Sequence, residues 1–293
     1  MAVPRRRGAG EPWVDDPGER AAAAAVGRAG LGPVDRVEPL GGMTNRNYRV
    51  DTLLGAFAVR LPGAGSDAYI DRGVEAHNAR AAAGLGLNCD VLHLDPDGTM
   101  VCRFVEGEVV APEDLAADGD RLEQLARTLW RLHTLAPPFR GRFDPVAEAR
   151  RHRRSLAVVP DGVDDLLAEI DGFDLVAPLS PCHNDAWPPN VVFRAEGGPV
   201  LVDWEYSAMN DPAWDLAHLS VECGLDDNDH ERLLRAYAGG RPPADLRRRV
   251  GLLRGVSDVV WGLWALVQHA DANPATDFES YAETRLRRAP NWW

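Results

Sequence analysis

Three oxygen-bearing side chains stand at spacings that suit phosphoryl transfer. Asp185 follows His183 by two residues, Asn190 comes five residues after Asp185, and Asp203 comes thirteen residues after Asn190. One carboxylate can orient a substrate hydroxyl and accept its proton, while the carboxamide and the other carboxylate offer the hard oxygen ligands that suit Mg²⁺. Phosphoryl transfer needs mainly positioning and neutralisation of phosphate charge. The spacing therefore predicts a site for Mg²⁺-nucleotide and a hydroxyl acceptor.

The residues between Asn190 and Asp203 predict the element that brings these side chains together. Two short apolar runs, 191–193 and 199–202, flank a Gly-Gly turn, which is typical of a β-hairpin. A hairpin joins its own ends, so Asp185 and Asn190 should lie near Asp203. The alternative is that they are ordinary turn residues and that Asp203 caps a helix.

The bulk properties indicate a globular protein with a reducing environment. The chain has 293 residues, 45% of them hydrophobic and 26% charged, and no Lys. The formal net charge of −13 argues against a nucleic-acid partner or an anionic membrane surface. Four cysteines without a CxxC pair predict free thiols, and we find neither a signal-like apolar region nor a run of membrane length. We expect a cytoplasmic protein without membrane insertion.

The element pattern changes from strand-rich to helix-rich about a third of the way along the chain. The first third predicts strands at 34–40, 47–52, 56–61, 91–94 and 99–104, with helices at 21–29 and 71–83. The remainder predicts helices at 121–135, 143–157, 163–170, 214–222, 230–238, 244–269 and 277–287. This order predicts an α+β architecture of two lobes. We expect a disordered tail at 1–18, an N-lobe at 19–105 for nucleotide binding and a C-lobe at 106–293 with the catalytic loop and the acceptor pocket.

A Gly-rich turn between the first two strands offers donors to phosphates. It reads Gly41-Gly42-Met43-Thr44-Asn45, so backbone N–H groups, the Thr44 hydroxyl and the Asn45 amide can face phosphate oxygens. The turn is not a GxGxxG motif, and taken alone it is more typical of a plain β-turn.

Further candidates for nucleotide binding follow in the first lobe. Arg60 stands on the third strand, where kinase-like enzymes use a Lys on the phosphates, and its planar guanidinium can bind phosphate; the alternative is an Arg in solvent. Glu75 on the next helix can pair with Arg60, or with Arg72 one turn before it. Arg103 and Val105 end the last strand of this lobe, where backbone groups can meet adenine.

The acceptor side carries negative charge and two tryptophans. Between Arg194 and Arg232 there is no Lys or Arg but there are ten Asp and Glu residues, which favours a cationic acceptor or, more simply, a solvated acidic surface. Trp261 and Trp264 share one face of a helix. Two indoles can form a cage for a quaternary ammonium through cation–π attraction, although this spacing alone is more typical of core tryptophans.

Taken together, these residues resemble the choline/ethanolamine kinase family, particularly bacterial choline kinases of the lic type, over residues 34–270. Ala186 stands where that family usually has Leu. The motifs that carry the resemblance are Gly41-Gly42-Met43-Thr44-Asn45-Arg46-Asn47-Tyr48, Val59-Arg60-Leu61-Pro62-Gly63, Asp71-Arg72-Gly73-Val74-Glu75, His183-Asn184-Asp185 with Asn190, Asp203-Trp204-Glu205-Tyr206, and Trp261-Gly262-Leu263-Trp264.

The resemblance implies a protein-kinase-like fold with ATP and Mg²⁺ as cofactors. It also implies a role for each matching residue. These are Asp185 as the catalytic base, Asn190 and Asp203 as metal ligands, Glu205 close to the metal, and Tyr206, Glu222, Trp261 and Trp264 as the lining of a choline pocket.

We therefore predict an ATP-dependent small-molecule kinase that phosphorylates choline or a related cationic alcohol. A kinase of another amine-bearing alcohol, such as an aminoglycoside or thiamine, is the first alternative. A non-catalytic protein that binds nucleotide or amine is the second. A protein kinase is disfavoured, because no Ala-Pro-Glu follows Asp203 at a suitable distance.

Overall fold

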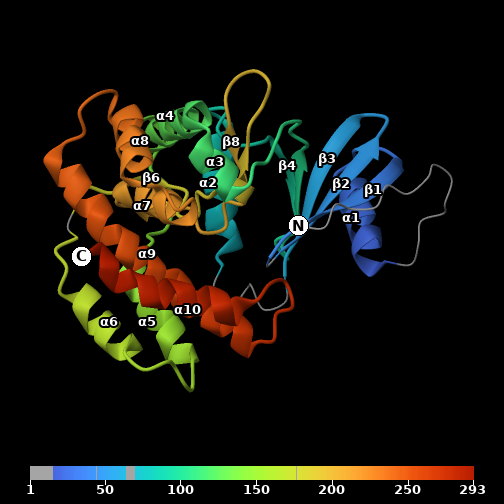
Figure 1. Ribbon diagram of the computed structural model, residues 1–293. Coiled ribbons are helices and arrows are strands. Elements are labelled where there is room, and N and C mark those ends of the chain that lie inside the picture. Colours follow the sequence, from blue (N-terminus) through green and yellow to red (C-terminus); the bar gives the residue numbers. More distant parts are fainter. Residues whose placement is uncertain (1–15, 44, 64–69, 176) are drawn as a thin grey trace. The chain divides into compact units, whose positions relative to one another are not determined.

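The computed structural model describes residues 16–43, 45–63, 70–175 and 177–293. The chain divides into two compact units, one made of Met1–Ala64 and Leu92–Phe104, the other of Gly65–Val91 and Val105–Trp293 (Figure 1). The segment 65–91, which we assigned to the N-lobe from the sequence, groups with the second unit. Most of the predicted tail lies outside the described residues, but Pro17 and Gly18 are already helical.

The first unit is one antiparallel sheet covered by a helix. Its strands lie in the order β1-β2-β3-β5-β4. Burial alternates along β2 because successive side chains point to opposite faces of the sheet. The helix α1 begins at Pro17, where the Asp16 carboxylate accepts a hydrogen bond from the Gly18 N–H at 2.6 Å. The elements are α1 (Pro17–Arg28), β1 (Val34–Gly41), β2 (Arg46–Thr52), β3 (Gly55–Leu61), β4 (Val91–Leu94) and β5 (Met100–Arg103).

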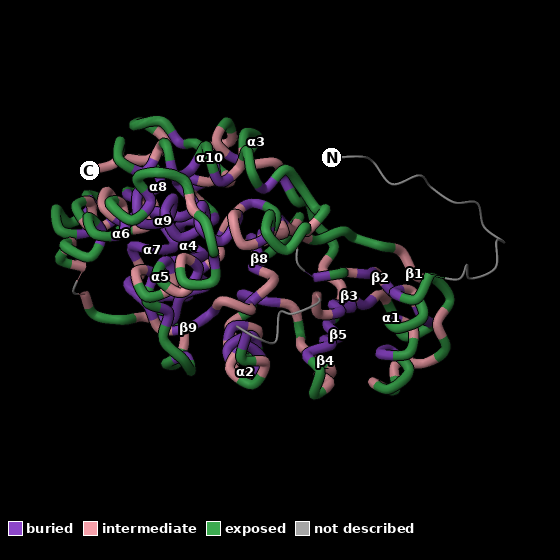
Figure 2. The backbone as a smooth tube through the Cα atoms, turned by 90° about the horizontal axis from the view of Figure 1, so that it is seen from below, coloured by how far each residue is buried: buried purple, intermediate pink, exposed green. Residues whose placement is uncertain are grey.

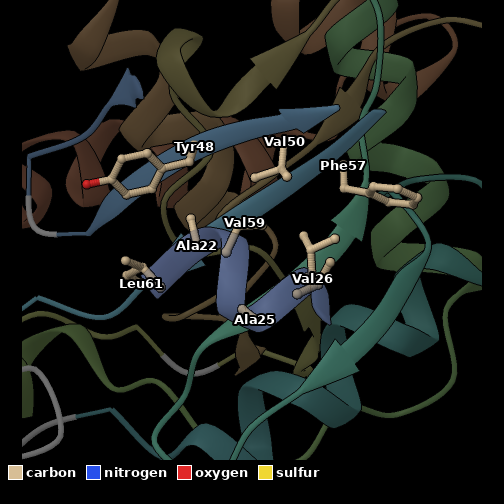
Figure 3. Close-up of a cluster of buried hydrophobic side chains, with 9 residues drawn as sticks. Ala22, Ala25, Val26, Tyr48, Val50, Phe57, Val59 and Leu61 are labelled. Atoms are coloured by element: carbon tan, nitrogen blue, oxygen red, sulfur yellow. The ribbon is translucent and has the colours of Figure 1, made fainter. Parts of the chain in front are cut away.

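The hydrophobic core of the first unit lies between α1 and the sheet. Figure 3 shows Ala22 and Val26 on the helix close to Val50 and Val59 on the strands. The small alanine side chains allow the helix to approach the sheet closely. Phe57 on β3 belongs to the same cluster and is only 1% exposed.

The second unit is mostly helical and is built around α9. This helix contacts α5, α6, α7 and α10, and α7 and α9 are largely buried (Figure 2). By length and composition α9 is apolar enough to cross a membrane, but 72% of its apolar window is buried, as in a core helix. The helices are α2 (Arg72–Ala83), α3 (Pro112–Ala117), α4 (Gly119–Leu135), α5 (Pro145–Ser155), α6 (Val163–Asp171), α7 (Ala213–Glu222), α8 (Asp227–Ala238), α9 (Ala244–Ala270) and α10 (Phe278–Arg288).

Two short ribbons position the chemistry within the second unit. The strand β6 (Ser180–Cys182) pairs with β9 (Ala208–Asn210), and β7 (Val191–Val192) pairs with β8 (Val200–Leu201). The second ribbon confirms the predicted hairpin. The 3-10 helix η2 (Pro188–Asn190) leads directly into it.

The helix α2 is fixed to the second unit by backbone acceptors. Asn78 donates from Nδ2 to the carbonyl oxygens of Arg140 at 3.1 Å and Ser207 at 2.8 Å, and the Arg140 N–H donates to its Oδ1 at 2.9 Å. The Leu201 N–H also donates to the Leu87 carbonyl at 2.8 Å. These bonds explain why the segment 65–91 groups with the second unit.

The predicted elements are all present, each within four residues at either end. The sequence missed α3, β6 and β9, which are only three to six residues long and carry no clear periodicity. All four cysteines are free, as predicted.

Replacement of Phe57 tests the core of the first unit. We expect Phe57→Ala to lower the free energy of unfolding by about 3–5 kcal/mol, because it leaves a cavity under α1. Leu53→Ala, at a side chain that is 85% exposed, is the matched control and should change the free energy by less than about 0.5 kcal/mol. Urea denaturation measures both, and an equal effect of the two changes would contradict this packing.

Candidate active site

The loop before the hairpin is held by the buried carboxylate of Asp215 on α7. Its Oδ1 accepts the Asn184 N–H at 2.7 Å, and its Oδ2 accepts the His183 N–H at 2.9 Å and lies 3.0 Å from Nε2 of His133. Asp215 is fully buried, which alone would raise its pKa, but the contacts with His133 and with His183 lower the pKa below its ordinary value. The carboxylate therefore fixes the backbone immediately before Asp185.

Asn184 adopts a left-handed backbone conformation in this loop, with φ of +68°. Its Nδ2 donates to the Tyr206 carbonyl at 2.8 Å, and its Oδ1 accepts from Asn210 at 2.9 Å. The Trp214 indole donates to its carbonyl at 3.0 Å. Asn tolerates positive φ better than most residues, and these contacts hold it there.

Asp185 is held at both carboxylate oxygens. The Asn190 amide donates from Nδ2 to Oδ2 at 2.9 Å and to the Asp185 carbonyl at 3.0 Å. Nε2 of His218 lies 3.2 Å from Oδ1. The Asp185 side chain is 19% exposed, so a substrate can reach it.

The hairpin brings Asn190 next to the end of β8, where Asp203 follows. The Val202 N–H donates to the Asn190 carbonyl at 2.9 Å, and Nε2 of His183 lies 3.0 Å from the Val202 carbonyl. Asp203 itself has a positive φ of +62°. Asn190 is thus paired through its backbone with the residue immediately before Asp203, as expected of the predicted hairpin.

The donor set fits a hard divalent cation such as Mg²⁺. Because Nδ2 of Asn190 is bonded to Asp185, its Oδ1 remains the available acceptor, and Asp203 adds a carboxylate. Burial raises the pKa of Asp185 to about 7, and the negative charge of Asp203 acts in the same direction. A cation between Asn190 and Asp203 would oppose that shift and favour the ionised carboxylate.

Glu205 is tied to α2 by an arginine. Nη1 of Arg72 lies 3.4 Å from Glu205 and 3.0 Å from Glu75, and Glu75 is 1% exposed. The pair with Arg72 is one of the two partners predicted for Glu75. The arginine holds Glu205 two residues beyond Asp203.

Tyr206, Trp261 and Trp264 form an aromatic cluster. The Tyr206 and Trp261 rings are 5.2 Å apart at 86°, and the two indoles are 5.8 Å apart at 80°. Trp261 and Trp264 are buried, and no acceptor for their indole N–H groups lies among the described residues. Buried core tryptophans usually pair this group, so the cluster has the features of a ligand-binding surface.

Glu222 lies 3.7 Å from Nδ1 of His218, whose ring is 5.4 Å from the ring of Trp261, and its carboxylate already has other partners. It pairs with the buried guanidinium of Arg285 and accepts from the Tyr281 hydroxyl at 3.3 Å. Asp258 binds the other side of Arg285 at 3.1 Å, and burial lowers the pKa of Arg285 to about 9. Glu222 therefore offers little uncompensated charge to a second cation.

The residues predicted to bind nucleotide lie in both units. Asn45, Arg60 and Arg103 belong to the first unit, while Glu75 and Val105 belong to the second; Thr44 lies outside the described residues. Arg60 is 8% exposed, so the solvent-facing alternative is wrong, and it donates to the Gly98 carbonyl at 3.3 Å. Their role in nucleotide binding stays a prediction.

The sequence analysis missed several residues that the structure brings to the site. Neither His218 nor Asp215 was among the site residues predicted from the sequence. Both are polar residues one turn apart on a largely apolar helix, but this pattern does not show which buried groups they face. Tyr281 and Arg285 on α10 had no signal, since they lie far along the chain from the hairpin.

Comparison with known proteins gives matches along nearly the whole chain. Residues 36–250 match the model of the phosphotransferase enzyme family. A choline/ethanolamine kinase family protein from Mesorhizobium loti is 34% identical, with a TM-score of 0.81 and 94% of each chain covered.

Two LicA structures match at 27% identity over 94% of this chain and 98% of theirs. One is the choline kinase LicA from Streptococcus pneumoniae, with a TM-score of 0.82, and the other is LicA in complex with AMP, with a TM-score of 0.77. These matches confirm the predicted α+β fold of the protein-kinase-like type.

Replacement of Asp215 tests the anchoring of the loop. We expect Asp215→Asn to lower the free energy of unfolding by about 2–3 kcal/mol and to speed exchange of the loop amides, because an NH₂ group then faces buried N–H donors. Amide hydrogen exchange and urea denaturation measure this. Asp226→Asn is the control: Asp226 caps α8, where Asn serves equally well. Unchanged exchange at Asn184 would refute the anchoring role of Asp215.

Proposed function

Because the chain belongs to the phosphotransferase enzyme family, and within it to the choline/ethanolamine kinase family, we propose that it transfers the γ-phosphoryl group of ATP to the hydroxyl of choline. As a member of this family it is a small-molecule kinase that acts on the hydroxyl of an amino alcohol. We propose choline in particular among the amino alcohols. This choice rests on the aromatic cluster of Tyr206, Trp261 and Trp264.

In the proposed reaction Asp185 orients the alcohol and accepts its proton. The alcohol oxygen forms a bond to the γ-phosphorus, the bond to the β,γ-bridging oxygen breaks, and ADP leaves. The contacts from Asn190 and His218 aim the carboxylate. Asn190 and Asp203 would hold Mg²⁺, which when bound neutralises charge on the phosphates. Use of ATP is supported by the AMP bound to the related LicA.

The aromatic cluster supports a cationic acceptor. Its rings stand nearly perpendicular to one another, so an ammonium can meet the electron-rich face of more than one ring. The cluster also lies close to the base, since the Trp261 ring is 5.4 Å from the ring of His218, which contacts Asp185. A small alcohol can therefore span the cage and the carboxylate.

Choline fits this pocket better than ethanolamine for an electrostatic reason. A primary ammonium carries three N–H donors that need acceptors when buried, whereas a quaternary ammonium carries none. Glu222, the acidic residue beside the cage, is occupied by Arg285 and Tyr281. Aromatic faces can stabilise the quaternary group without such acceptors.

Release of ADP across a panel of alcohols tests the proposal. With Mg²⁺-ATP we expect the highest kcat/KM for choline, a lower one for ethanolamine, and little turnover of thiamine or aminoglycosides. Asp185→Asn should lower kcat by at least about 100-fold while the affinity for Mg²⁺-ATP, measured by calorimetry, stays within about threefold. Preference for thiamine or an aminoglycoside would overturn the choline assignment. Full activity of Asp185→Asn would overturn the role of the base.

Truncation of Trp261 tests the cage. We expect Trp261→Ala to raise the KM for choline about 2- to 30-fold, since it removes cation–π stabilisation of about 0.5–2 kcal/mol. Trp261→Phe keeps an aromatic face and should have a smaller effect. Trp130→Ala, at a side chain that is 42% exposed on α4, is the control. An unchanged KM for choline in Trp261→Ala would contradict the cage.

A further inference from the structure

His218 connects the predicted base to the aromatic cluster. It lies on α7, one turn after Asp215, and its side chain is 1% exposed. Nε2 lies 3.2 Å from Oδ1 of Asp185, and Nδ1 lies 3.1 Å from the hydroxyl of Ser257 on α9. Both ring nitrogens therefore have partners, and one of these is the carboxylate proposed to carry the chemistry.

When Asp185 is ionised, which a cation at Asn190 and Asp203 would favour, the two partners determine which nitrogen of His218 carries the proton. An ionised carboxylate only accepts hydrogen bonds, so Nε2 must donate to Asp185, and Nδ1 of the neutral ring then accepts from the Ser257 hydroxyl. Burial lowers the pKa of His218 to about 3, and the positive charge of Arg285 acts in the same direction. Glu222 lies 3.7 Å from Nδ1, too far for a hydrogen bond. The ring is a neutral donor.

The ring of His218 has two aromatic neighbours. It lies parallel to the Trp214 indole, with ring centres 6.3 Å apart at 4°, and 5.4 Å from the Trp261 ring at 37°. Trp214 in turn donates to the Asn184 carbonyl in the catalytic loop. The imidazole is thus fixed in rotation as well as in position, so its N–H has a defined direction.

On the premise of the proposed kinase function, we propose that His218 is a positioning residue: its Nε2–H holds Oδ1 of Asp185 while Asn190 holds Oδ2. The terminal torsion of an Asp side chain has a broad energy profile, so one contact leaves the carboxylate free to turn. Two contacts on opposite oxygens leave it one orientation, facing the acceptor hydroxyl. The same ring also packs near Trp261, so His218 links the position of Asp185 to that of the aromatic cluster.

Paired substitutions separate this role from a merely structural one. His218→Phe keeps the ring packing against Trp214 and Trp261 but removes the donor, and should lower kcat about 10- to 100-fold. The KM values for choline and ATP should stay within about threefold, because the cage remains. His218→Gln keeps an amide N–H near the position of Nε2 and should restore most of kcat.

A matched control is available on α8. Nδ1 of His230 lies 2.9 Å from the Ser220 hydroxyl, and burial lowers its pKa to about 4, so it is a neutral, half-buried histidine with a serine partner like that of His218. His230→Phe should leave kcat within about twofold. Equal losses in both Phe variants, or no gain in His218→Gln over His218→Phe, would overturn the proposal.

Nitrogen-15 NMR of the His218 imidazole tests the hydrogen bond to Asp185 independently of turnover. At a pH above the pKa of Asp185, where its carboxylate is ionised, we expect His218 in the wild-type protein to be neutral, with the proton on Nε2, and the NMR signal of that proton should shift in Asp185→Asn. A proton on Nδ1, or an Nε2–H that does not respond to Asp185→Asn, would refute the contact. Absence of turnover with every alcohol would refute the proposed function, while this spectrum would still decide the role of His218.

Discussion

Asp215 accepts hydrogen bonds from two successive backbone N–H groups of the loop before Asp185, and the geometry of the candidate site follows from this contact. Because the carboxylate is buried on a packed helix, it holds Asn184 in its left-handed conformation and so directs Asp185. The loop then continues through η2 into the hairpin, whose register sets Asn190 against Val202, the residue before Asp203. The short ribbons would specify little alone, since isolated two-stranded hairpins are only marginally stable.

The carboxylates near the aromatic cluster form ion pairs with arginines of α10. Glu222 and Asp258 bind Arg285, and Asp258 also binds Arg288, so the acidic groups around the cage are compensated by α10. Breaking one ion pair of such a buried network lowers the stability of the protein by several kcal/mol. We therefore expect these carboxylates to keep their arginine partners when a cation binds nearby. In the proposed site, recognition of the acceptor is left to the aromatic faces of Tyr206, Trp261 and Trp264, which favour a large, weakly hydrated cation.

Much of the candidate site could be predicted from local sequence patterns. The spacing of Asp185, Asn190 and Asp203 around two β-branched runs predicts the hairpin, because strand pairing and turn chemistry are local. Arg285 could not be found in this way, since only tertiary packing brings α10 to α7. His218 was missed for a different reason: a histidine on an apolar helix gives no sign of which buried group it faces. The grouping of α2 with the second unit likewise depends on the distant bonds of Asn78.

The central claim is that three side chains around one hairpin serve a single Mg²⁺-nucleotide and a single alcohol. A crystal structure of the protein with Mg²⁺, a non-hydrolysable ATP analogue and choline tests it most directly. We expect oxygens of Asn190 and Asp203 about 2.0–2.1 Å from Mg²⁺. The choline hydroxyl should lie within hydrogen-bond distance of Asp185, with the ammonium against Trp261 and Trp264. A metal bound without Asn190 and Asp203, or choline held away from Asp185, would contradict the account.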